Sequence, residues 1–170
     1  MKDNRNKSVT LTFLRSELVY DCENYSFVEG DIMGDDQQHA KHQVFDIAQD
    51  GNVDRVTRVL NLCFAHCVEL LYPFSKENVV DGMTTTDRLV AHDKYELKLM
   101  VPDDFSSTTI RYLTKLIHEL MVCCVMQDWM SITKPSSKNT WQEKIDGLEK
   151  QVAASVKERT GRVRRPMNPF

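Results

Sequence analysis

The segment Cys63-Phe64-Ala65-His66-Cys67 places two thiols four residues apart, with an imidazole beside the second thiol. On a helix this spacing puts both thiols on one face, where they could bind zinc through sulfur. His66 lies one residue off that face, and no second pair of ligands stands at the spacing of a structural zinc site. We therefore interpret Cys63 and Cys67 as small buried side chains of an apolar helix.

His39 and His42 could present two imidazoles on one helical turn. They lie in a polar stretch without a carboxylate at a fixed spacing, which favours a pair of surface side chains. The chain also lacks a nucleophile elbow, and its six glycines never cluster as a phosphate loop or a dinucleotide fingerprint requires. The sequence thus predicts a protein that is not an enzyme, with no catalytic residue, no metal and no cofactor.

The C-terminal segment is the strongest candidate for binding a partner. From Arg159 onward it contains four arginines and no acid. The planar guanidinium group suits carboxylates, because it can donate two parallel hydrogen bonds to them. A peptide with so little apolar pattern cannot fold on itself, so we expect an extended arm docked in a groove of another protein, with DNA phosphates as the second choice. The predicted docking residues are Arg162, Arg164, Arg165, Pro166, Pro169 and Phe170.

The net charge of −3 conceals a strong asymmetry along the chain. Between Glu17 and Asp54 there are ten acids and a single base, Lys41. A solvated acidic face and a loose basic tail would explain this pattern, and opposite poles on identical subunits would also suit head-to-tail packing in a ring. The longest apolar run, residues 120–126, is far shorter than the ~20 residues that cross a bilayer, so we expect no membrane contact.

Alternating polar and apolar residues predict two strands, residues 8–13 and 94–101. Strands so far apart in sequence can pair only as a small ribbon, which needs helices to cover it. In the second strand one face should be buried and the other should carry the charges of Lys94, Glu96 and Lys98. The expected buried face consists of Tyr95, Leu97, Leu99 and Val101.

Apolar residues at helical spacing predict four helices. The first should be short, with Ser16 as its N-cap, and the second should run from residue 53 to about 71. The third and longest should follow a cap at Ser106 or Ser107 and bury a broad stripe that includes Leu113, Ile117 and Leu120. The fourth should begin with a capping box at Thr140.

These elements predict an α+β fold that is predominantly helical, with a small two-stranded ribbon against a helical bundle and extended terminal arms. We expect residues 1–161 to form a single domain with a polar excursion at about 31–50, and residues 162–170 to form an extended basic C-terminal arm.

The order of the elements resembles that of small structural proteins of tailed bacteriophages, particularly the head–tail connector and ring (neck) subunits of phages that infect Bacteroidales. The resemblance rests on a helix ending in Tyr72-Pro73-Phe74, a strand ending near Val101-Pro102, a long helix ending in Asp128-Trp129, and a final helix running into Arg162-Val163-Arg164-Arg165-Pro166. It implies a homo-oligomeric ring, most often a dodecamer, beneath the portal and around the DNA channel.

The resulting hypothesis is a virion subunit, assembled in the host bacterial cytoplasm, whose partners are copies of itself, the portal, and neighbouring neck or tail proteins. Nonspecific contact with packaged DNA would follow from the same location. Two alternatives remain. One is a cytosolic adaptor that binds a partner through its acidic stretch or basic tail, and the other is a small metal-binding enzyme that uses the histidines or cysteines named above.

Overall fold

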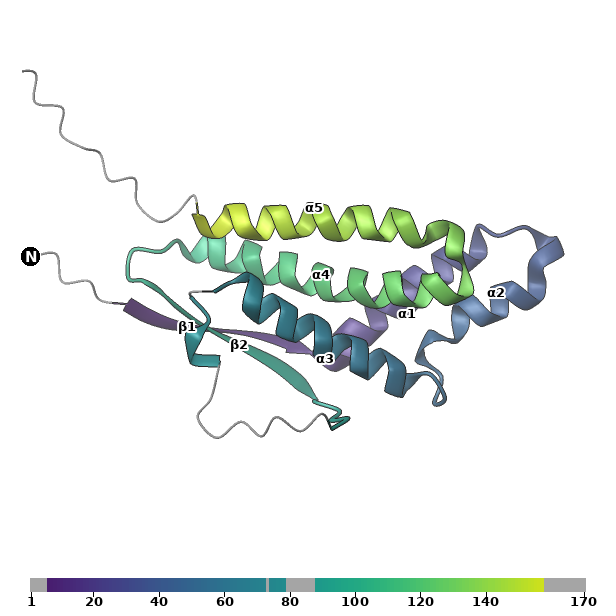
Figure 1. The fold of residues 1–170 in the computed structure, drawn as a ribbon, viewed down its shortest axis with the longest axis horizontal. Helices are drawn as coiled ribbons and strands as arrows, with labels where there is room; N and C mark the ends of the chain where they lie inside the picture. The colour runs from purple at the N-terminus through teal and green to yellow at the C-terminus, as the bar shows by residue number, and fades with distance from the viewer. Residues whose placement is uncertain (1–5, 73, 79–87, 158–170) are drawn as a thin grey trace, which may run out of the picture.

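A computed structural model describes residues 6–72, 74–78 and 88–157 of the chain. In this part of the chain five α-helices and a two-stranded sheet form the fold (Figure 1). The prediction of an α+β, mainly helical fold is therefore confirmed. The elements are β1 (Asn6–Leu14), α1 (Arg15–Asp31), α2 (Gln38–Phe45), α3 (Val53–Leu70), β2 (Lys94–Pro102), α4 (Ser107–Thr133) and α5 (Lys138–Lys157).

The two strands pair antiparallel, in a register that runs from Asn6 opposite Pro102 to Leu14 opposite Lys94. Each strand alternates, so one face of the ribbon is buried under the helices and the other is exposed. Both predicted strands are confirmed, and so is the buried face of the second. The buried residues of the ribbon are Leu11, Phe13, Tyr95, Leu97, Leu99 and Val101.

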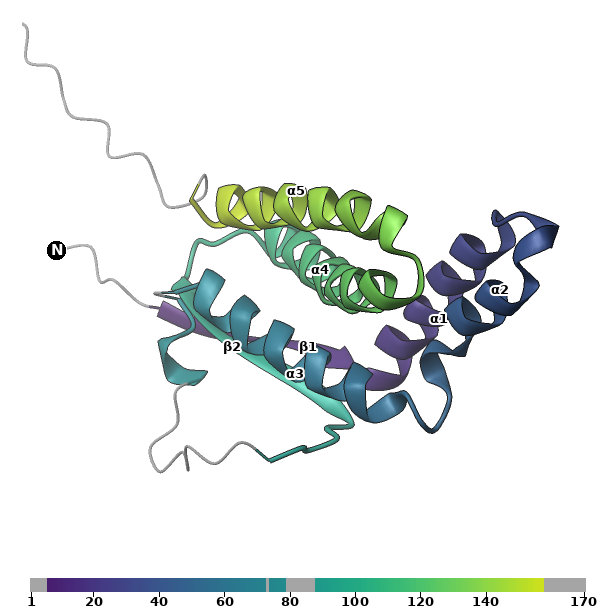
Figure 2. The same cartoon turned by 45° about the vertical axis from the view of Figure 1, so that its right-hand side comes forward.

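Helix α4 is the centre of the core. Leu113, Ile117 and Leu120 are fully or almost fully buried, as the spacing predicted. Ser106 caps the helix by accepting a hydrogen bond from the Thr109 N–H at 3.4 Å. Helix α5 lies along α4 (Figure 2) and buries the narrow stripe of Trp141, Ile145, Val152 and Val156.

Two predicted helix starts are wrong. Helix α1 begins at Arg15 with Leu14 as its N-cap, so Ser16 lies inside the first turn. The Arg15 N–H donates to the Asp93 carbonyl at 3.0 Å, which continues the strand ladder directly into the helix. Helix α5 begins at Lys138, before Thr140, because a 3₁₀ turn over Pro135–Ser137 already starts the helical path.

The predicted polar excursion at 31–50 contains structure of its own. Helix α2 packs against α1, and the two project together at one end of the molecule (Figures 1 and 2). Val44 and Ile47 are buried there, and the Trp129 indole N–H donates to the Val44 carbonyl at 2.9 Å. Gly30 lies inside α1, where any Cβ would overlap the Phe45 ring, so this glycine permits the close approach of the two helices.

A partly buried carboxylate joins three of the helical segments. Glu29 on α1 accepts hydrogen bonds from the Lys134 ammonium at 2.7 Å, the Ser137 hydroxyl at 3.0 Å and the Trp141 indole at 3.1 Å. These donors stand at the end of α4, in the following turn and at the start of α5. The contacts therefore fix the α4–α5 corner onto α1.

None of the described helices is long and apolar enough to cross a membrane.

Candidate docking interface

The predicted docking residues of the C-terminal arm, Arg162, Arg164, Arg165, Pro166, Pro169 and Phe170, lie outside the described residues. The described body still contains the surface on which a docking interface would be built. Three features of that surface lie on or beside β1 and α1: an unpaired strand edge, an acidic groove and exposed apolar side chains of α1.

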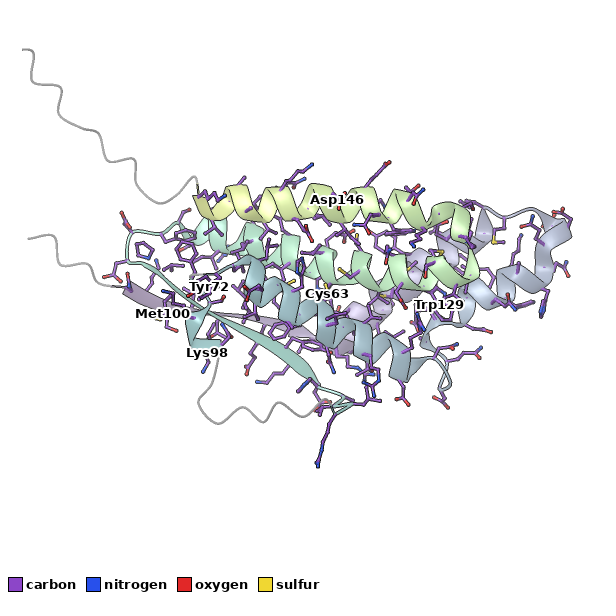
Figure 3. All side chains as sticks on the ribbon, in the orientation of Figure 1. Cys63, Tyr72, Lys98, Met100, Trp129 and Asp146 are labelled. Carbon is purple, nitrogen blue, oxygen red and sulfur yellow. The ribbon has the colours of Figure 1, made fainter. Side chains whose placement is uncertain are left out.

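The edge of β2 that faces away from β1 is already covered. The Met100 N–H donates to the Phe74 carbonyl at 2.8 Å. The Asn78 side chain accepts from the Lys98 N–H at 3.1 Å and donates to the Lys98 carbonyl at 2.6 Å. Figure 3 shows Lys98 and Met100 on β2 beside the turn that carries Tyr72. This side of the ribbon therefore offers little room for another strand.

The opposite edge, on β1, is open. Arg15 donates its N–H to the Asp93 carbonyl, so these two residues form a hydrogen-bonded pair at the end of the ladder. Along an antiparallel ribbon such pairs alternate with pairs whose main-chain groups point away from the partner strand. The main-chain N–H and C=O groups of Ser8, Thr10 and Thr12 consequently point away from β2. Within the described part of the chain these outward groups have no hydrogen-bond partner. An edge of this kind is a template for pairing with another segment.

A groove of about 570 Å³ lies beside this edge, between β1, α1 and α4. A smaller hollow of about 240 Å³ follows along α1 and shares two lining residues with it. The two hollows adjoin at Asp21 and Glu119, along the α1–α4 junction. We call them together the β1 groove, and its main lining residues are Thr12, Leu14, Glu17, Asp21, His118 and Glu119.

The charged lining of the β1 groove is mainly acidic. It has three carboxylates, from Glu17, Asp21 and Glu119, and one lysine, Lys115. The Nε2 atom of His118 lies 2.8 Å from the Asp21 carboxylate. Glu17 is exposed and has no ion-pair partner among the residues described. The groove is therefore suited to a cationic occupant.

The wall of the groove formed by α1 and α4 is held by aromatic contacts that extend to α5. The Tyr25 hydroxyl donates to the Glu119 carboxylate at 2.6 Å, and this hydrogen bond, with burial, raises the pKa of Tyr25 above its ordinary value. The Tyr25 ring packs edge-on against Trp141 at 5.1 Å between centroids. The Lys144 ammonium lies 4.0 Å from the centre of the Trp141 ring. These contacts make the Glu119 carboxylate a fixed feature of the groove.

Helix α1 also exposes large apolar side chains next to the groove. Tyr20 and Phe27 lie seven residues apart on one side of α1, and Val28 lies on the adjacent side; they are 59%, 61% and 57% exposed. Ile32, which caps the helix, is 70% exposed, and Leu14 at its start is 49% exposed. A run of apolar side chains beside an open strand edge is typical of an interaction surface.

The thiol pair from the sequence does not form an exposed site. Cys63 and Cys67 are buried in α3 against α4, and Figure 3 shows Cys63 within the packed helices. A hydrogen bond with the Cys124 thiol lowers the pKa of Cys63, but contact with Cys67 and burial raise it well above the ordinary range. The His66 imidazole bonds the Glu149 carboxylate at 2.7 Å.

The histidine pair lies on α2, and both side chains are exposed. The His39 ring contacts Gln43 at 3.5 Å, and the His42 ring lies edge-on to Phe45 at 6.5 Å. Over residues 6–72, 74–78 and 88–157, no three His, Cys, Asp or Glu side chains come together in a way that could hold a metal ion.

Replacing Cys63 and Cys67 together with alanine should leave assembly unchanged and lower the free energy of unfolding by about 1 kcal/mol per site, because only buried packing is lost. Native mass spectrometry of the purified chain should find no bound zinc before or after the substitution. One equivalent of zinc, lost on substitution, would contradict the packing role of these thiols.

No protein-family model matches the chain, and comparisons with curated proteins and with solved structures found no significant similarity.

The β1 groove was missed by reasoning from the sequence. Its acidic residues were visible as part of the Glu17–Asp54 charge excess, but Glu119 lies far outside that stretch. The open state of the β1 edge has no local signal, because it depends on which other segment covers each strand.

Proposed function

We propose that this chain is a non-enzymatic virion subunit of a tailed phage, which forms a head–tail connector ring beneath the portal and around the DNA channel. It would assemble in the host bacterial cytoplasm. Its partners would be further copies of itself, the portal and neighbouring neck or tail proteins, with nonspecific contact to the packaged DNA. The resemblance of its element order to connector and ring proteins is the starting point of this proposal.

The observation that carries the proposal is the separation of charge along the molecule. The α1–α2 pair, within the stretch that has ten acids and one base, lies at the end of the body opposite the C-terminal end of α5 (Figures 1 and 2). The sequence after α5 carries four arginines and no acid from Arg159 onward. Identical subunits with opposite poles can pack head to tail, and such heterologous contacts form a ring when the rotation between neighbouring subunits closes.

A protein-binding adaptor is the second candidate, and the open β1 edge favours it as well. An extended peptide from an unrelated host protein could add to such an edge as readily as a segment of a neighbouring subunit. The two candidates differ in the mass of the purified particle. A ring protein forms large homo-oligomers alone or with the portal, whereas an adaptor stays monomeric until its own partner is added.

Deleting residues 162–170 should abolish incorporation into the ring while leaving the melting temperature of the monomer almost unchanged. The reason is that the arm is expected to contact other subunits and not its own core. Mass photometry, with and without the portal protein, measures the particle mass. The full chain should reach about twelve copies, and the truncated chain should remain small.

The matched control replaces residues 162–170 with a neutral segment of the same length, built of glycine and serine. It keeps the length of the chain but removes the arginines, so it should fail to assemble like the deletion. A truncated chain that still assembles would rule out the arm as the docking element. A full chain that stays monomeric with the portal present would overturn the ring proposal and favour the adaptor.

A further inference from the structure

We propose that the β1 groove receives the arginine-rich C-terminal segment of a second copy of this chain, which adds to the open edge of β1 as a third strand. The proposal deepens the ring function and rests on it for the identity of the neighbour. It names the receiving surface, which lies on β1, α1 and α4, and the occupant, which is residues 159–170.

The strand edge is suited to this role because nothing on the described body protects it. Native proteins usually cover an edge strand, shorten it, or place charges or proline on it. β1 is nine residues long, and its outward positions Ser8, Thr10 and Thr12 are small and neutral. The one lysine within the strand, Lys7, turns its ammonium away to the carbonyls of Asp103 and Phe105, at 3.0 and 2.9 Å. The β2 edge is covered at Lys98 and Met100, so among the described residues β1 has the longer open edge.

The occupant has the backbone that an added strand requires. From Arg159 to Arg165 there is no proline, so every residue of this stretch has an N–H to offer. Pairing with the outward groups of Ser8, Thr10 and Thr12 needs about five residues. Pro166 follows directly and would end the pairing, because proline cannot donate to a ladder.

The side chains of the segment match the lining of the groove. Arg162 and Arg164 stand two residues apart, so in a strand they share one face, with Val163 on the other. The groove offers Glu17 without an ion-pair partner in the described chain, and Asp21 beside it on α1. A guanidinium group can donate two parallel hydrogen bonds to a carboxylate, which gives direction as well as attraction.

The position of the C-terminal end of α5 favours a second copy as the source of the segment. In both views α4 lies between α5 and the ribbon, so the segment after α5 starts on the other side of α4 from β1 (Figures 1 and 2). A segment that starts there meets the acidic groove of a neighbour when subunits are arranged head to tail. The same contact repeated from copy to copy would close the ring.

The test uses full-length variants and a labelled synthetic peptide of residues 158–170, with binding followed by fluorescence anisotropy. Thr10→Pro removes one outward N–H and leaves the β1–β2 ladder intact, so it should weaken peptide binding about tenfold or more. Thr10→Val keeps that N–H and is the matched control, with binding expected to stay as in the unmodified chain. Thermal melting checks that all variants are folded.

A second variant keeps the test valid if Thr10→Pro unfolds. Glu17→Arg changes an exposed residue, so it should leave the melting temperature unchanged while it weakens binding of the peptide about tenfold. A peptide in which the four arginines are replaced with glutamate should bind the unmodified chain poorly but bind Glu17→Arg better than the original peptide does. Equal binding of the original peptide by Thr10→Pro, Glu17→Arg and the unmodified chain would overturn the proposal.

Two further outcomes separate this inference from the ring function. If the full chain forms rings, and Thr10→Pro and Glu17→Arg form them equally well, the groove is not the receiving surface although the ring function stands. If the full chain stays monomeric but binds the peptide through the groove, the surface is correct and the ring function fails. Slow hydrogen exchange of the Thr10 amide in an isolated monomer would show that the chain's own segment fills the groove, which would overturn the second-copy assignment.

Discussion

Replacing Ile117 with alanine should lower the free energy of unfolding by about 2–5 kcal/mol. Ile117 is 0% exposed and lies in the central helix, where the inner face of the ribbon and the surrounding helices share one core. Truncation to alanine removes buried methyl groups and leaves a cavity that the packed neighbours fill only in part. Urea unfolding followed by circular dichroism measures the loss.

The same helix offers a matched control. Ile132 has the same side chain on α4 but is 55% exposed. Ile132→Ala should therefore change the free energy of unfolding by no more than about 0.5 kcal/mol. Equal losses at the two positions would contradict the central place of Ile117 in the core.

The second large effect is expected at Glu29. Replacing Glu29 with alanine should lower the free energy of unfolding by about 3 kcal/mol. The Glu29 and Lys134 side chains are only 16% and 17% exposed. Removing the carboxylate leaves the Lys134 ammonium without its charge partner and leaves the donors of Ser137 and Trp141 unpaired. Glu23→Ala, on the exposed side of the same helix, should have little effect on the urea midpoint.

The contribution of Glu29 should also depend on pH. Burial raises the pKa of Glu29, but hydrogen bonds from Lys134, Ser137 and Trp141 and the Lys134 charge outweigh burial and lower it below its ordinary value of 4.5. A carboxyl group with a lowered pKa in the folded state stabilises the fold fully above that ordinary value, and the contribution is lost as the pH falls through the folded-state pKa.

Urea unfolding of the unmodified chain and of Glu29→Gln at several pH values measures this dependence. The difference in free energy of unfolding should be constant near neutral pH and should shrink below pH 4.5. A difference that stays constant down to the lowest pH at which both proteins fold would show that the carboxylate charge of Glu29 does not contribute.

Periodicity was a sound guide to the elements because each pattern reflects the local geometry of one segment. The alternation of Tyr95 and Leu97 with charged neighbours predicted the buried face of β2, and the spacing of Leu113 and Ile117 predicted the buried face of α4. Helix ends were less predictable, since the first residue of a helix depends on the conformation of the segment that precedes it. Ser16 is not the N-cap of α1, because β1 leads directly into the helix and Leu14 takes that position.

The sequence by itself determined the mainly helical α+β class, the two strands, the buried stripe of α4 and the uneven distribution of charge. The basic composition of residues 159–170 is also plain in the sequence, whereas the extended arm predicted there lies outside the described part of the chain. Only the tertiary structure decided which strand edge is open and what lies beside it. The partners of Glu29 stand 105 to 112 residues away, and Glu119 meets Tyr25 across 94 residues. Such contacts leave no local pattern, because they arise when separate elements pack, and packing is what brought β1, α1 and α4 together into one acidic groove.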